Sequence, residues 1–178
     1  MGEWQNRYRI ILILNKLFIM KGFTLLETII SVAILAAMVV GSLTLISKSM
    51  QSAFISQNRL IASYLAQEGI ELVRNVRDSN WEDDDYPVSV DWDDDLPDCE
   101  NCEMDYTTNV LADGGDPFLK LDSDNFYNYS LGADTIFRRR ISLKTIFDRQ
   151  KQVIVEIIWQ YQGSDHNLAV TAFLYNWQ

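Results

Sequence analysis

The chain has 178 residues, of which 48 % are hydrophobic and 22 % are charged. This composition fits one globular domain with an appendage, and it excludes a large multidomain enzyme and an intrinsically disordered chain. The formal net charge of −10 opposes broad binding to nucleic acid. We therefore do not expect nucleic acid as a general partner.

The charged residues are distributed very unevenly along the chain. Between Asp78 and Asp124 there are 17 acidic residues and a single basic one, Lys120. Before residue 22, four basic residues are opposed only by Glu3. The sequence thus has a basic N-terminal end, an apolar stretch and an acidic body.

Residues 23–46 form the apolar stretch, in which Glu27 is the only ionisable residue. As a helix rising about 1.5 Å per residue, this stretch reaches about 36 Å and can cross a hydrocarbon layer of about 30 Å. Basic residues precede it and acidic residues follow it, so the positive-inside rule keeps the N-terminus in the cytoplasm. We expect a single span of the cytoplasmic membrane, with the residues beyond about 47 exported.

Glu27 needs a cation, because an unpaired carboxylate in an apolar helix is costly in a membrane. Residues 21–27 read KGFTLLE and precede about twenty apolar residues. This segment resembles the class III signal of type IV prepilins and pseudopilins. The resemblance implies that a prepilin peptidase cuts between Gly22 and Phe23 and methylates the new amino group of Phe23. It also implies that this amino group pairs with Glu27 during subunit assembly.

The resemblance implies a structural subunit, without enzymatic activity, of a type IV pilus-like or pseudopilus filament. The partners would be prepilin peptidase, other pilin or pseudopilin subunits and an inner-membrane assembly platform. We expect a minor subunit that reaches an extracytoplasmic or cell-surface filament after processing. Glu27 at the interface of an ordinary signal anchor remains an alternative, and the chain would then be a tethered acidic binding domain.

A further alternative is a DNA-uptake pilus subunit that contacts DNA. Its basic residues would be Arg138, Arg139, Arg140 and Lys144. Strand alternation spreads these groups over both faces of a strand, and the overall negative charge repels DNA. An enzyme is not expected, because the chain has one histidine and no recognisable catalytic motif.

Residues 1–22 are interpreted as the leader peptide. Leaders of this family are usually short and hydrophilic, whereas residues 8–20 are largely apolar. Met20-Lys21-Gly22 alone would make a minimal leader. Our hypothesis is that translation starts at Met20 and that residues 1–19 are upstream sequence read in frame.

Beyond the membrane span, apolar residues recur at intervals of four and seven. This pattern predicts one long helix over residues 24–77, whose second half, residues 47–77, is amphipathic. Two helices broken at Gly69 are the alternative. The turn-favouring residues 78–80 are predicted to end the helix. The predicted apolar stripe consists of Met50, Phe54, Ile61, Leu65, Leu72 and Val76, with Val39 and Leu43 in register.

Residues 78–116 are predicted to form an acidic variable loop with at most two edge strands, at 86–92 and 104–111. Residues 117–178 are predicted to form an antiparallel sheet because their apolar residues alternate. A helix followed by such strands predicts an α+β fold, in which one sheet face packs on the amphipathic half of the helix, as in pilins. Within the sheet we expect a hairpin around 122–124, strands at 135–146, 152–161 and 167–177, and a turn at 162–165.

Cys99 and Cys102 are the only cysteines, and the predicted topology places them outside the cytoplasm. A small-loop disulfide is the leading interpretation there, with a zinc site, a redox pair and free thiols as alternatives.

The acidic region also suggests a calcium site, because calcium prefers six to eight oxygen ligands. The best cluster is Asp113, Asp116, Asp122 and Asp124, together with Asn125. A solvated acidic surface that keeps an exported subunit soluble is the alternative. Apart from calcium, no cofactor is expected.

Overall fold

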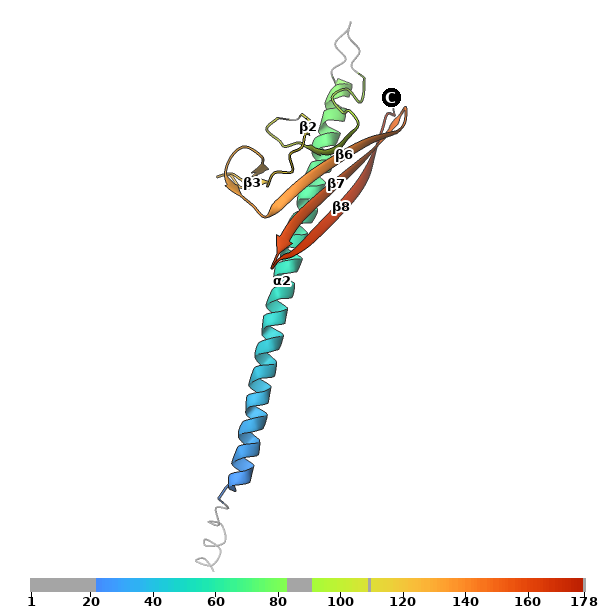
Figure 1. Ribbon diagram of the computed structural model, residues 1–178. Coiled ribbons are helices and arrows are strands. Elements are labelled where there is room, and N and C mark those ends of the chain that lie inside the picture. Colours follow the sequence, from blue (N-terminus) through green and yellow to red (C-terminus); the bar gives the residue numbers. More distant parts are fainter. Residues whose placement is uncertain (1–21, 83–90, 109, 178) are drawn as a thin grey trace, which may run out of the picture. The chain divides into compact units, whose positions relative to one another are not determined.

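The computed structural model describes residues 22–82, 91–108 and 110–177 and has an α+β fold (Figure 1). The predicted fold class is therefore confirmed. The chain divides at Gln51/Ser52 into two compact units. The elements are α2 (Leu25–Glu82), β1 (Cys99–Glu103), β2 (Ala112–Asp113), β3 (Lys120–Leu121), β4 (Tyr127–Asn128), β5 (Ala133–Asp134), β6 (Phe137–Phe147), β7 (Gln150–Tyr161) and β8 (Ser164–Tyr175).

The helix α2 is continuous over 58 residues and passes through Gly69 without a break. The prediction that residues 78–80 end it was wrong, because α2 continues to Glu82. Asp78 and Asn80 use their side chains in hydrogen bonds, one to a neighbouring residue and one to a distant segment. Arg77 donates to the carboxylate of Asp78 at 2.6 Å. The side-chain amide of Asn80 donates to the backbone carbonyl of Asp94 at 2.7 Å.

The main sheet is antiparallel, with the strand order β2-β1-β6-β7-β8. Figure 1 shows its three long strands, β6, β7 and β8, side by side. Their positions agree with the three predicted strands to within a few residues. The predicted turn after β7 is confirmed as the two-residue loop Gln162-Gly163. Its positive φ values of 51° and 77° are those of a type I′ hairpin turn.

The predicted hairpin around residues 122–124 is also present, and it belongs to a second, small sheet of order β4-β3-β5. Asp122 closes its turn, because its carboxylate accepts the backbone N–H groups of Asp124 and Phe126, each at 2.9 Å. A single aspartate thus provides the local reason why the chain reverses there.

The acidic region contains the two strands β1 and β2 within its described residues, in agreement with the prediction of at most two. The predicted strand at 104–111 was wrong, because its described residues contain no strand. The predicted strand at 86–92 lies mostly outside the described residues, which exclude 83–90. Trp92 and Met104, which belong to the predicted fragments, are instead buried in the hydrophobic core.

The core lies between one face of α2 and the inner face of the main sheet. The predicted stripe was only partly right: Leu65 and Val76 are buried, but Met50 and Phe54 are about half exposed. Small residues let the sheet approach the helix, and the prediction omitted them. The buried helix positions are Ala62, Leu65, Ala66, Gly69, Ile70, Val73, Val76 and Arg77. They face Phe137, Ile141, Leu143, Val153, Val155, Ile157 and Trp159 of the sheet.

Candidate functional site

The residues of the predicted processing and assembly signal lie at the N-terminal end of α2, just before it and in its first turn. Gly22, Phe23 and Thr24 precede the helix. The hydroxyl of Thr24 accepts the backbone N–H of Glu27 at 3.2 Å, and its carbonyl accepts that of Thr28 at 3.1 Å. Thr24 is therefore the N-cap of α2.

Thr24 and Glu27 have the spacing of a capping box, in which a carboxylate three residues after the cap supports the helix start. Glu27 also lies at the positive end of the helix dipole. This local reason for an acid at position 27 can be read from the sequence alone, and our sequence analysis missed it. Any role in assembly has to be separated from it by experiment.

Gly22, Phe23 and Glu27 are all exposed, and the side chain of Phe23 is 74 % exposed. Lys21 lies outside the described residues. The peptide bond between Gly22 and Phe23 precedes the first helical residue, so it lies in non-helical backbone. No ion pair to Glu27 is present among the described residues. The amino group that we expect to pair with it exists only after cleavage.

The apolar part of α2 has no cover within the described chain. Every residue from Leu25 to Gln51 is exposed, including the large side chains of Leu35, Val39 and Leu43. This is a helix long and apolar enough to cross a membrane, with none of its apolar window buried. A helix that is apolar all round requires lipid or protein around it in its working environment.

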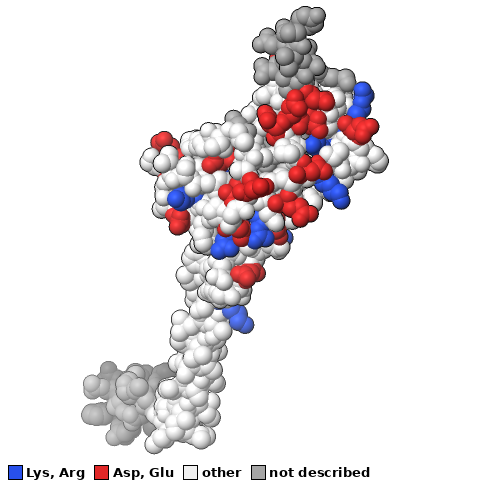
Figure 2. Space-filling model, turned by 45° about the horizontal axis from the view of Figure 1, so that its top comes forward, with Lys and Arg blue, Asp and Glu red and all other residues white. Residues whose placement is uncertain are grey.

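The acidic side chains are concentrated on the domain and are nearly absent from the apolar segment of α2. Figure 2 shows acidic side chains across one face of the domain, whereas the helical segment that precedes the domain in the chain is largely white. Several carboxylates are engaged locally. Burial raises the pKa of Asp105, but hydrogen bonds from Thr107 and from the backbone of Tyr129 and Thr108 outweigh it, and the net pKa is lowered.

The predicted calcium ligands are not brought together. No group of three His, Cys, Asp or Glu side chains suited to a metal ion occurs among the described residues. Asp116 is bonded to Arg140 and Arg138, at 2.7 and 3.2 Å. Asp122 closes the small-sheet turn and accepts the hydroxyl of Tyr106 at 2.8 Å. These carboxylates therefore serve as internal acceptors, and we do not propose a calcium site.

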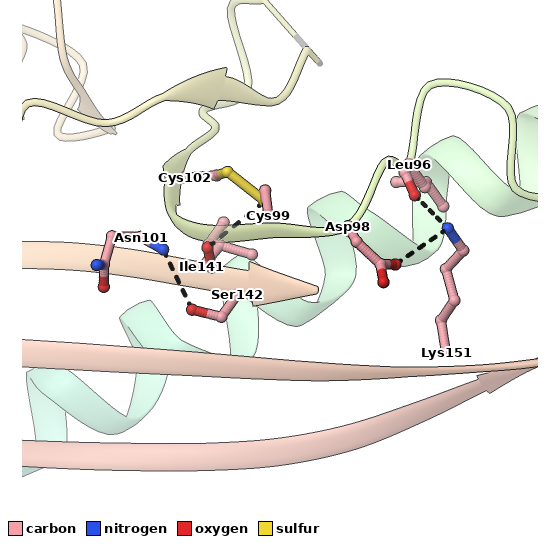
Figure 3. Close-up of a disulfide and its surroundings, with 8 residues drawn as sticks. All are labelled: Leu96, Asp98, Cys99, Asn101, Cys102, Ile141, Ser142 and Lys151. Carbon is pink, nitrogen blue, oxygen red and sulfur yellow. Dashed lines mark hydrogen bonds and ion pairs between the residues drawn. A yellow bond between two sulfur atoms is a disulfide. The ribbon is translucent and has the colours of Figure 1, made fainter. Parts of the chain in front are cut away.

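The structure joins Cys99 to Cys102 in a disulfide within β1 (Figure 3). The pairing with β6 changes register between these two cysteines, where Asn101 has a φ of 59°. The backbone N–H of Asn101 donates to the hydroxyl of Ser142 at 3.2 Å. The disulfide thus closes a bulge in β1, beside an open groove of about 560 Å³ lined mainly by polar side chains.

A buried lysine of β7, Lys151, contacts the acidic region through ion pairs and a hydrogen bond. The side chain of Lys151 is 5 % exposed, and its ammonium lies 3.1 Å from Asp93 and 3.7 Å from Asp98. It also donates to the carbonyl of Leu96 (Figure 3). The hydrogen bond from Thr145, aided by Lys151, lowers the pKa of Asp98. Sequence analysis did not assign this role to Lys151.

Three of the four basic residues of the DNA alternative are engaged within the domain. Arg138 and Arg140 are paired with Asp116. Arg139 is fully buried, where it donates to the carbonyl of Met104 at 2.7 Å and pairs with Glu68 at 3.2 Å. The pairing of Arg139 with Glu68 joins α2 to the sheet. These internal contacts do not array the three guanidinium groups for phosphate binding.

The described residues form an α+β fold and contain one helix that is long and apolar enough to cross a membrane. Comparisons with protein-family models, with curated proteins and with solved structures gave no match for this chain. Its function has to be inferred from its residues and their geometry.

Proposed function

We propose that this chain is a minor subunit of a type IV pilus-like or pseudopilus filament. In this proposal, prepilin peptidase removes residues 1–22 and methylates Phe23, and the subunit assembles through the apolar part of α2. The observation that carries the proposal is the uncovered apolar helix that begins at Leu25, two residues after Phe23, with Glu27 in its first turn.

An uncovered apolar helix suits a subunit that moves from lipid into a filament. Lipid covers the side chains around Leu35 and Leu43 before assembly, and the helices of neighbouring subunits cover them afterwards. Because lipid tails are as apolar as these side chains, the transfer needs a further, specific interaction. The domain from Ser52 onward has its own core and stays folded in both environments.

Cleavage supplies that interaction. Removing residues 1–22 leaves a cationic amino group on Phe23, four residues from the carboxylate of Glu27. In an apolar environment, opposite charges attract far more strongly than in water, and an unpaired carboxylate is costly. Pairing within a subunit or between neighbours would therefore set the register of packed helices.

The capping box offers a competing explanation for Glu27, and one pair of variants separates the two. Glutamine at position 27 preserves the capping box but removes the charge, whereas valine removes both. We expect Glu27→Gln and Glu27→Val to insert into the membrane normally and to be poorly incorporated beside wild-type subunits. The measurement is the amount of each variant in sheared filaments relative to the membrane fraction.

Normal incorporation of Glu27→Gln beside a failing Glu27→Val would assign Glu27 to helix capping and contradict the charge-pairing account. Thr24→Ala serves as the matched control, because it removes the cap and leaves the carboxylate. We expect it to incorporate better than Glu27→Gln.

A further inference from the structure

We propose that the open edge of β8 binds an extended segment of another protein, which adds to the main sheet as a sixth strand. β8 is the last strand in the order β2-β1-β6-β7-β8, and it lies at the outer side of the sheet in Figure 1. It pairs with β7 along its entire length, from Ser164 to Tyr175, with no register shift. Twelve residues thus form a regular edge without a bulge.

Pairing geometry identifies the unpaired backbone groups of this edge. The two-residue loop makes Ser164 and Tyr161 a hydrogen-bonded pair, and such pairs alternate along an antiparallel ladder. Every second residue of β8 therefore directs its N–H and C=O away from β7. None of these residues takes part in the backbone hydrogen bonds outside the ladders and helices of the described chain. They are Asp165, Asn167, Ala169, Thr171, Phe173 and Tyr175.

Natural proteins usually protect such an edge by making it short or by adding lysine, proline or a bulge. β8 contains no lysine, arginine or proline, and its only acidic residue, Asp165, lies near its start. The opposite edge is protected. β2 has only two residues, Ala112 and Asp113, and Pro117 follows shortly after. The sheet therefore presents one long open edge.

The side chains beside the β8 edge favour an added strand with an apolar face. On the side facing α2, Ile141 of β6 and Val155 of β7 are completely buried. Leu168, Val170 and Ala172 occupy the same face of β8 but are only partly buried, although they pack against the core. A strand with apolar residues at alternate positions would bury them in the same way.

A second copy of this chain does not fit the edge. Two copies of β8 paired about a two-fold axis would run antiparallel, so residues 52–82 of the two chains would run in opposite directions. Chains anchored in one membrane need the same direction, and this step alone rests on the proposed function. Head-to-tail pairing would place β8 against β2, which is only two residues long. The occupant is therefore a different protein.

The negative charge of the domain restricts which segments of a partner protein can bind to the β8 edge. The domain carries most of the 17 acids between Asp78 and Asp124, and Glu156 and Asp165 lie along or beside the β8 edge. An acidic segment would be repelled. We infer an extended, neutral or basic segment that alternates apolar and polar residues and forms strand-addition contacts with backbone hydrogen bonds.

Amide hydrogen exchange of the full chain in detergent micelles tests the edge directly. In the free chain, the amides of Asn167, Ala169 and Thr171 should exchange at least tenfold faster than those of Leu168 and Val170. The probe is a synthetic twelve-residue peptide that alternates valine with threonine and carries lysine at both ends. Its addition should slow the three fast amides at least tenfold. Slow exchange at these amides in the free chain, or no slowing by the peptide, would overturn the proposal.

Backbone variants separate strand addition from side-chain binding. Thr171→Pro removes an outward N–H and should retain the fold, because proline is tolerated on edge strands. It should abolish the slowing by the peptide, whereas Thr171→Ala should retain it. Val170→Lys is the second variant if Thr171→Pro unfolds. Because lysine on an edge strand opposes pairing with another strand, this variant should also abolish the slowing of amide exchange by the peptide. Equal peptide binding by the proline or lysine variant and the wild type would contradict the proposal. None of these experiments requires cleavage or a filament, so their failure would leave the proposed function standing.

Discussion

The two halves of α2 belong to one continuous helix but differ in what covers them. From Leu25 to Gln51 every residue is exposed, whereas eight residues between Ala62 and Arg77 are buried against the domain. The first half is apolar on all sides, and the second half is apolar on one. The first surface is long and apolar enough to cross a membrane, whereas the second is covered by the chain's own sheet.

The largest expected difference between the two halves is in the stability lost when a leucine is replaced by alanine. Leu65 is 2 % exposed in the core, and Leu43 is 59 % exposed. Leu65→Ala should lower the free energy of unfolding of the domain by about 2 to 5 kcal/mol, because it leaves a cavity. Leu43→Ala should change it by less than about 0.5 kcal/mol. Urea unfolding in detergent, followed by tryptophan fluorescence, measures both. Equal losses would show that the two halves do not differ as described.

Substituting a glycine in each half of α2 should give a smaller difference in stability, caused by overpacking instead of a cavity. A Cβ atom at Gly69 would lie 2.9 Å from Cγ1 of Val155 and 3.2 Å from Cδ of Arg139, whereas nothing lies within 4 Å of one at Gly41. Gly69→Val should destabilise the domain by about 1 to 3 kcal/mol through overpacking. Gly41→Val should leave its unfolding midpoint unchanged. A stable Gly69→Val variant would mean that the helix and the sheet can move apart at low cost.

The smallest expected effect is a dependence on pH that is confined to the domain. The hydrogen bond from Arg140, together with the charges of Arg140 and Arg138, lowers the pKa of Asp116 despite partial burial. An acid whose pKa is lowered by folding contributes stability above its unfolded pKa, near 3.9, and loses it as the pH falls through the folded pKa. Asp116→Asn should therefore be less stable than wild type at pH 7, and the difference should shrink below about pH 4.

Urea unfolding midpoints between pH 7 and pH 3 measure this effect. Asp124→Asn is the control, because Asp124 is exposed and has no ion pair among the described residues. A constant difference between wild type and Asp116→Asn across this range would contradict the assigned role of the Arg140 contact.

The parts of the fold that depend on periodicity could be predicted from the sequence. Alternation located β6, β7 and β8, and it puts Ile141 and Val155 on the same faces as their apolar neighbours, which are buried in the core. The same alternation puts Arg139 and Lys151 on those faces, and both are buried. Both are buried because carboxylates and backbone carbonyls surround their cationic groups. A charged residue in register with a core face can thus be predicted as a buried anchor.

Contacts between distant segments could not be predicted in this way. Asn80, near the end of α2, donates to the carbonyl of Asp94, and this contact joins residues 14 positions apart in the chain. The predicted calcium cluster failed for the same reason, because the pairing of Asp116 with Arg140 spans 24 residues. The hydrogen bond from the N–H of Glu27 to the hydroxyl of Thr24 is different: it is local, and the capping-box spacing of these two residues was visible in the sequence.

The central claim is that proteolysis turns the exposed apolar helix into an assembly element, and the intact mass of the chain isolated from its own cells tests it most directly. We expect a chain that begins at Phe23, lacks residues 1–22 and carries one additional methyl group on its amino terminus. A chain that retains Lys21 and Gly22 would contradict the filament account and leave a membrane-tethered acidic domain.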